Sequence, residues 1–136
     1  MQVHELRGFG LEHLHRAERP APEPGPGQVR VRVSAVSLNY RDLMMVRGEY
    51  NSRQPLPLVP LSDGVGTIEA LGPGVRGLAI GERVAGLFAQ AWLAGKPTAE
   101  ALRSTLGGPR DGMLAEAVVL DAQGVVPVPE HLDDVE

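Results

Sequence analysis

The sequence predicts a mainly β domain with short helices, in which a mostly antiparallel sheet curves into a small, barrel-like structure. Glycine and proline are frequent, with 17 and 12 residues among 136, and they separate short apolar runs as turns do in β-rich domains. Only 4% of the residues are aromatic, so the core must be built mainly from Val, Leu and Ala. The segment 28–36, QVRVRVSAV, alternates apolar and polar residues with the period of a half-buried strand.

The first half of the chain predicts a hairpin, a strand and a helix. Two short strands over residues 3–18 form the hairpin, and a turn rich in proline and glycine leads into strand 28–36. Over residues 39–47 the apolar spacing becomes helical, and Gly48 is expected to end this helix. Three prolines make the following segment, 52–60, an irregular loop.

The second half predicts further strands at 64–72, 113–120 and 125–129. The clearest helix signal lies between the first two of these, at 98–108. Thr98 can cap this helix, Leu102 and Leu106 are expected on one face, and the glycine pair at the end of the segment is expected to stop it.

The last residues of the chain carry the signal that starts a helix. Asp133 can act as an N-cap, and Glu136 follows three residues later in an acidic variant of the capping box. A single helical turn is not stable alone. We therefore expect one domain over 1–128, with 129–136 as the start of a linker or helix that leads to a domain absent from this chain.

Composition and charge argue against several classes of function. The formal net charge is −4 with no basic block, so no nucleic-acid partner is expected. The chain has no cysteine, which excludes disulfides and cysteine-based zinc or iron–sulfur sites. Neither a signal peptide nor a run of 18 apolar residues occurs, so we expect no membrane partner and a cytoplasmic location.

Two patterns look like known sites but have simpler interpretations. Residues 72–77 (GPGVRG) match G-x-G-x-x-G, yet Gly81 interrupts the run that follows, which then regains strand-like spacing. We interpret these glycines as tight turns that need positive φ angles. His13 and His15 are expected on one face of a strand, but no third ligand lies near them, so an exposed strand face is the better interpretation.

Two polar clusters remain open to two interpretations. Asn39 can cap a helix and Asp42 suits its first turn, but the run between them could equally line a reaction pocket. Ser62 and Asp63 precede a glycine without a nucleophile-elbow motif, so a turn is a better interpretation than a hydrolase nucleophile.

Four segments, in order, resemble the N-terminal catalytic domain of the medium-chain dehydrogenase/reductase superfamily, which includes zinc alcohol dehydrogenases and zinc-free quinone oxidoreductases. They are 35–50 (AVSLNYRDLMMVRGEY), 57–75 (PLVPLSDGVGTIEALGPGV), 81–88 (GERVAGLF) and 111–132 (DGMLAEAVVLDAQGVVPVPEHL). The resemblance covers essentially the whole chain and implies a GroES-like, partly open β-barrel. It also implies a Rossmann domain after these segments, which is absent from this chain.

The resemblance further implies a site without zinc. Zinc-dependent members have a Cys where Asn39 falls, a His–Glu pair where Ser62–Asp63 falls, and a His near Met44. Amide and hydroxyl groups bind zinc poorly. The N-Y-x-D pattern instead resembles the quinone oxidoreductase-like branch, in which NAD(P)H supplies a hydride without a metal.

By this resemblance, Asn39 and Tyr40 are catalytic residues that face the nicotinamide and donate hydrogen bonds to a substrate carbonyl. Asp42 is the third catalytic residue, and it supports the wall of the cleft together with Arg41. The predicted substrate pocket consists of Arg41, Tyr50, Ser62, Asp63 and Trp92.

Three positions leave the shape of this pocket open. Leu61 stands where the family has a glycine, and Ala117 stands where an aromatic residue is common. Trp92 lies in the segment 90–111 that replaces the zinc lobe. It either covers a bound substrate or packs the expected helix onto the barrel, which is the commoner role of large aromatic residues.

The sequence thus predicts the N-terminal catalytic domain of a zinc-independent NAD(P)(H)-dependent oxidoreductase, which transfers hydride to or from a carbonyl, enone, quinone or alcohol. NADP is favoured over NAD, the parent protein is expected to be a homodimer, and the 136-residue chain alone is expected to be inactive. The alternative is a stand-alone GroES-like interaction module without redox activity. A third hypothesis, metal-dependent alcohol oxidation, requires stoichiometric zinc.

Overall fold

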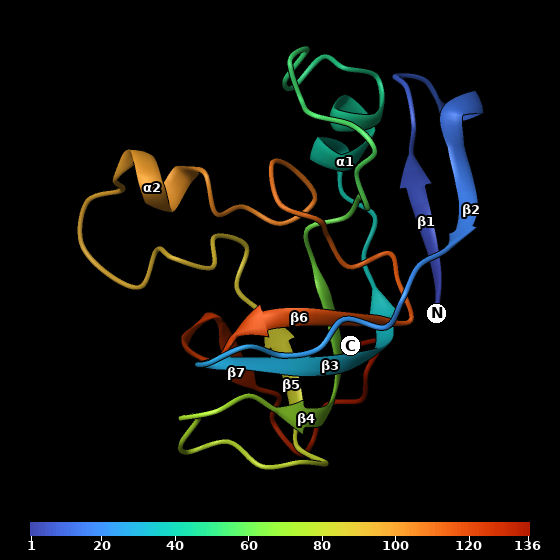
Figure 1. Ribbon diagram of the computed structural model, residues 1–136. Coiled ribbons are helices and arrows are strands. Elements are labelled where there is room, and N and C mark those ends of the chain that lie inside the picture. The colour runs from blue at the N-terminus through green and yellow to red at the C-terminus, as the bar shows by residue number, and fades with distance from the viewer.

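The computed structural model describes residues 1–136 and has the mainly β fold that the sequence predicts. The strands are β1 (Gln2–Leu6), β2 (Leu14–Glu18), β3 (Gln28–Val36), β4 (Gly64–Leu71), β5 (Arg83–Gly86), β6 (Ala117–Asp121) and β7 (Val125–Pro127). β1 and β2 form the predicted hairpin, and the other five strands form one antiparallel sheet in the order β6-β3-β4-β5-β7 (Figure 1). Neither sheet closes on itself, which confirms a partly open barrel.

The core lies on the inner face of the five-stranded sheet. β3 alternates as predicted, since Val29 and Val31 are fully buried while Arg32 is exposed. The buried cluster consists of Val29, Val31, Ile68, Val84, Leu106, Met113, Val118, Leu120 and Val125. Each of these side chains stabilises the fold by about 1.5–3 kcal/mol through removal of apolar surface from water.

The helical segments are α1 (Tyr40–Val46), α2 (Ala99–Leu102) and the 3-10 turns η1 (Leu11–His13) and η2 (Ala122–Gly124). α1 confirms the helix predicted after Asn39, and Gly48 follows it with a φ of 73°. None of these helices is long and apolar enough to cross a lipid bilayer.

The helix predicted over 98–108 is wrong in length, because α2 has a single turn. The predicted cap is present, since the Thr98 hydroxyl oxygen accepts the Ala101 N–H at 3.1 Å. The Ser104 hydroxyl then donates to the Ala101 carbonyl at 2.6 Å, which offers that carbonyl a partner other than a continued helix. Leu102 is 56% exposed whereas Leu106 belongs to the core, so the two do not share a face.

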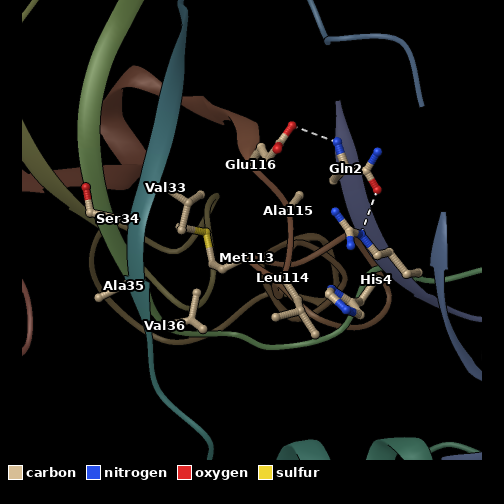
Figure 2. Close-up of a pocket in the computed structure, with 11 residues that line it drawn as sticks. Gln2, His4, Val33, Ser34, Ala35, Val36, Met113, Leu114, Ala115 and Glu116 are labelled. Carbon is tan, nitrogen blue, oxygen red and sulfur yellow. Dashed lines mark hydrogen bonds between the residues drawn. The ribbon is translucent and has the colours of Figure 1, made fainter. Parts of the chain in front are cut away.

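The strand predicted over 113–120 is also shorter, because residues 113–116 cross between the two sheets. The Glu116 N–H donates to the Gln2 carbonyl, and the Glu116 carbonyl accepts the Val33 N–H, both at 3.0 Å. A groove of about 380 Å³ lies where β1, the end of β3 and residues 113–116 meet. Figure 2 shows the side chains that line it. This groove lies between the two sheets, where the barrel is open.

The glycines of 72–77 form turns and are followed by β5 rather than by a helix. Gly74 and Gly77 have φ angles of 79° and 78°, as predicted. Gly72 has a different reason to be glycine, because an added Cβ atom would collide with the carbonyl oxygen of Gly25.

The capping box predicted near residue 136 is present. The Asp133 carboxylate accepts the N–H groups of Val135 and Glu136 at 2.7 and 3.0 Å, and the Glu136 carboxylate accepts the Asp133 N–H at 2.9 Å. These backbone hydrogen bonds lower the pKa of Asp133. Arg83 of β5 anchors the segment through an ion pair of 2.8 Å with Asp134.

Candidate functional site

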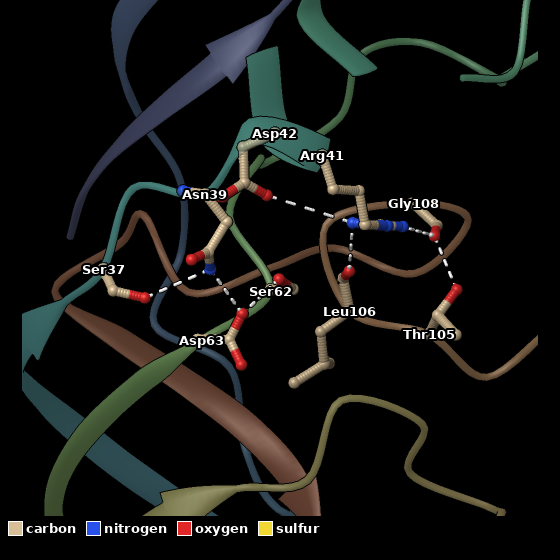
Figure 3. A network of polar contacts seen from close by, with 9 residues as sticks. All are labelled: Ser37, Asn39, Arg41, Asp42, Ser62, Asp63, Thr105, Leu106 and Gly108. Atoms are coloured by element: carbon tan, nitrogen blue, oxygen red, sulfur yellow. Dashed lines mark hydrogen bonds and ion pairs between the residues drawn. The ribbon is translucent and has the colours of Figure 1, made fainter. Parts of the chain in front are cut away.

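Five polar residues meet at the start of α1, and we call them the Asn39 cluster: Ser37, Asn39, Asp42, Ser62 and Asp63 (Figure 3). The Asn39 Nδ2 atom donates to Asp63 Oδ2 at 2.7 Å and to Ser37 Oγ at 3.1 Å. The Ser62 hydroxyl donates a short hydrogen bond to the same Asp63 oxygen. The structure therefore brings together the two polar segments that the sequence singled out.

The pairing of β3 with β4 produces this meeting. Val36, the last residue of β3, lies opposite Gly64, the first residue of β4. The chain continues this pairing one step further, because the Ser37 N–H donates to the Asp63 carbonyl at 3.2 Å. The side chain of Asn39 then reaches Asp63 from the N-terminus of α1.

Asn39 caps α1 as well as lining the cluster. The Asp42 carboxylate accepts the Asn39 N–H at 2.9 Å, and the Asp42 N–H donates to the Asn39 carbonyl at 3.0 Å. These contacts form the capping box of α1, and the Nδ2 atom of the Asn39 side chain is at the same time directed at Asp63. The helix cap and the polar site are therefore compatible uses of the same residues.

Leu61, directly before Ser62, is the one residue other than glycine with a φ in the left-handed region, at 72°. This conformation costs about 1–2 kcal/mol for a residue with a Cβ atom, which explains why a glycine suits the position. Leu61 is held in it by burial, with 4% of its surface exposed, and by the Met113 N–H, which donates to its carbonyl at 2.9 Å. The sequence showed that Leu61 replaces the glycine of the family, but it did not reveal the left-handed backbone conformation at this position.

The side chain of Arg41 reaches the loop that follows α2, and its guanidinium also lies beside Asp42 of the Asn39 cluster (Figure 3). Its two terminal nitrogens donate to the carbonyls of Leu106 and Gly108 at 3.2 and 2.7 Å. The guanidinium carbon lies 4.7 Å from the ring centroid of Tyr50 and 4.8 Å from that of Phe88. Sequence reasoning did not identify Phe88, whose only signal was an aromatic residue at the end of segment 81–88.

The remaining aromatic candidates are exposed. Tyr40 is 73% exposed and its hydroxyl makes no hydrogen bond within the chain. The Trp92 indole N–H donates to the carbonyl of Gly95 at 3.1 Å, within its own loop. No hydrogen bond or ion pair joins Trp92 to the Asn39 cluster.

Two cavities border the cluster. One, of about 290 Å³, is lined on one side by Ser37 and Asp63 and on the other by residues 134–136. The second, of about 230 Å³, is lined by Asn39 and Asp42 and mainly by leucines. The cluster thus borders space for a small molecule at Ser37 and Asp63 and again at Asn39 and Asp42.

The donor set does not fit zinc. The amide nitrogen of Asn39 is a hydrogen-bond donor to Asp63 and has no lone pair for a metal. No group of three or more His, Cys, Asp or Glu side chains in the chain could hold a metal ion.

The prediction that His13 and His15 share a strand face is wrong, because His13 lies in η1, the turn that reverses the chain between β1 and β2.

Residues 25–130 match the alcohol dehydrogenase GroES-like domain, so the chain belongs to this family within the medium-chain dehydrogenase/reductase superfamily. A zinc-type alcohol dehydrogenase-like protein of Schizosaccharomyces pombe is 44% identical over 100 residues, which cover 74% of this chain and 29% of that protein. The structure of an NAD-dependent alcohol dehydrogenase matches with a TM-score of 0.85 and 34% identity, over 98% of this chain and 41% of that chain. A mycobacterial structure complexed with NADPH matches with a TM-score of 0.73 and 25% identity, over 98% of this chain and 35% of that chain. The chain spans well under half the length of these relatives.

Proposed function

We propose that this chain is the N-terminal catalytic domain of a zinc-independent NAD(P)(H)-dependent oxidoreductase, which transfers hydride to or from a carbonyl, enone, quinone or alcohol. The family supports an oxidoreductase as the parent protein. The Asn39 cluster carries the proposal. It stands where the family resemblance places zinc ligands, yet its amide, hydroxyl and carboxylate groups are joined to one another by hydrogen bonds.

A nicotinamide cofactor held by a Rossmann domain outside this chain would supply or accept the hydride. On this chain Asn39 and Tyr40 would face the nicotinamide, beside the cavity that Ser37 and Asp63 border. The relatives named for NAD and for NADPH support a nicotinamide cofactor, and we propose NADP rather than NAD. A cytoplasmic homodimer remains part of the proposal on the resemblance alone.

The hydrogen bonds of the cluster support different roles for Asn39 and Tyr40. A side-chain amide has two N–H bonds, and those of Asn39 are directed at Asp63 and Ser37. The Tyr40 hydroxyl is exposed and free to donate. We therefore assign stabilisation of the developing charge on the substrate oxygen to Tyr40, and orientation of the reacting groups to Asn39.

The test is to assay the natural polypeptide that contains this chain beside the 136-residue chain alone. Oxidation of NADPH and NADH would be followed with a quinone, an enone and an aldehyde, and zinc would be measured by elemental analysis. We expect turnover by the natural polypeptide without stoichiometric zinc, and none by the 136 residues. Absence of nicotinamide binding would favour the interaction module, and activity that depends on added zinc would favour the metal-dependent hypothesis.

A further inference from the structure

Arg41 has an environment that helix packing alone does not explain. Its side chain is 16% exposed, and its Nε atom is buried without a hydrogen-bond partner, as is the Oδ1 atom of Asp42. An unpaired buried polar atom typically costs about 1–3 kcal/mol. An apolar residue of similar size is often at least as stabilising as a buried ion pair. The pair therefore points to a role beyond stability.

The guanidinium connects α1 with three other segments. In its plane it donates to the carbonyls of Leu106 and Gly108, and the rings of Tyr50 and Phe88 lie within the roughly 6 Å range of cation–π contacts. A planar guanidinium can stack on rings and donate a fork of hydrogen bonds at once, which the ammonium group of a lysine cannot do.

Arg41 also acts on the Asn39 cluster through Asp42. The Arg41 Nη1 atom lies 3.9 Å from Asp42 Oδ1, and no other cation forms an ion pair with this carboxylate. The second oxygen of Asp42 accepts the Asn39 N–H. Because the Asp42 side chain is only 5% exposed, its charge depends on Arg41 for compensation.

We propose that Arg41 is a positioning residue, which fixes the rings of Tyr50 and Phe88 and holds Asn39 through Asp42 without contacting the substrate. The two rings keep 51% and 38% of their residues' surface exposed, so a flat apolar substrate can pack against them. The effect of Arg41 on turnover rests on the proposed function. Its hold on the two rings does not.

The first experiment measures the Arg41 Nε–H proton by NMR in the 136-residue chain. Stacked rings move this resonance upfield, and we expect the shift to shrink in Tyr50→Leu and again in Phe88→Leu. Arg47, at the exposed end of α1, supplies the control resonance, which should not move. An Arg41 resonance at the position of an unstructured arginine would overturn the proposal.

The second experiment compares Arg41→Lys with Arg47→Lys in the natural polypeptide. We expect Arg41→Lys to raise KM for a quinone about 10-fold and to lower kcat about 10-fold. Each tenfold change corresponds to about 1.4 kcal/mol. Arg47→Lys should match the wild type in both constants. A purely structural role would reduce the active fraction and leave KM unchanged, and that result would overturn the positioning role. If the wild type shows no turnover at all, the proposed function fails, and the NMR shift decides whether Arg41 holds the rings.

Discussion

Two clusters of carboxylates in this domain differ in how completely their oxygens are paired. Near the N-terminus, Glu5 accepts hydrogen bonds from Arg7 and Arg19 at 2.8 Å each, and Arg19 also pairs with Asp111 at 2.8 Å. The other oxygen of Asp111 accepts the Val59 N–H at 2.8 Å. In this Glu5 cluster (Glu5, Arg7, Arg19 and Asp111) every carboxylate oxygen has a partner.

The Asn39 cluster and its neighbour Arg41 lack this completeness. The Oδ1 atom of Asp42 and the Nε atom of Arg41 are buried without partners, and Leu61 holds a left-handed backbone beside them. Strain and unpaired polar groups concentrate at functional sites, because folding alone would remove them. The comparison therefore predicts that the Glu5 cluster stabilises the fold and that the Asn39 cluster serves the proposed site.

The largest effect on stability is expected from Glu5→Gln. Glu5 is 7% exposed and pairs with two arginines, and loss of its charge leaves Arg7 without a charge partner and Arg19 with Asp111 alone. We expect unfolding free energy to fall by about 3 kcal/mol in urea melts, with kcat/KM of the natural polypeptide unchanged. Glu12→Gln, at a side chain 74% exposed, is the matched control and should change neither. A loss of turnover in the folded Glu5→Gln variant would contradict the prediction that the Glu5 cluster serves stability and not the site.

Asp63→Asn should lower kcat/KM and leave stability nearly unchanged, the opposite of the result expected for Glu5→Gln. An amide cannot offer the charged oxygen that both Asn39 and Ser62 use, so the Asn39 side chain loses its fixed orientation. We expect kcat/KM to fall about 30-fold, or roughly 2 kcal/mol, while the melting curve shifts little because Asp63 is only half-buried. Asp121→Asn, which removes the half-exposed ion pair with Arg110, serves as the control for charge loss. An equal loss of turnover in that variant would count against a specific role for Asp63.

The sequence predicted the parts of the fold that depend on neighbouring residues. The alternation in β3 and the cap at Asn39 are local, and the structure confirms both. The strand pairing that brings Ser37 and Asn39 to Asp63 is not local, so the meeting of the two polar segments followed from the family resemblance and not from spacing.

Other features could not be predicted because they depend on tertiary contacts. Phe88 becomes part of the site only when β5 ends beside Arg41, and Arg41 itself meets carbonyls more than sixty residues away. The helix after Thr98 stops at one turn because the core takes Leu106 out of the helical register. Leu61 shows the same effect in the backbone, where burial outweighs a conformational cost of about 1–2 kcal/mol.

The pH dependence of stability should follow the Glu5 cluster. Hydrogen bonds from Arg7 and then Arg19 hold the pKa of Glu5 below its ordinary value of 4.5. The unfolded chain therefore binds more protons in acid, and the stabilisation present above about pH 4.5 is lost as the pH falls through the lowered pKa. In urea melts between about pH 6 and pH 3, Glu5→Gln should flatten this slope by up to roughly 1.4 kcal/mol per pH unit. A residual slope of the same sign is expected from Asp133, whose pKa is also lowered.

The smallest effect is expected from Thr98→Ala, which tests whether the single turn of α2 contributes to either cluster. The change removes one cap hydrogen bond, to the Ala101 N–H, and such caps contribute about 1 kcal/mol or less at exposed sites. Arg41 donates hydrogen bonds to the carbonyls of Leu106 and Gly108, which lie after the turn of α2 in the chain. We therefore expect kcat/KM to stay at the wild-type value. Thr98→Ser, which keeps the cap, is the matched control and should restore the melting curve. A fall in turnover with Thr98→Ala but not with Thr98→Ser would extend the functional region past Arg41 into α2.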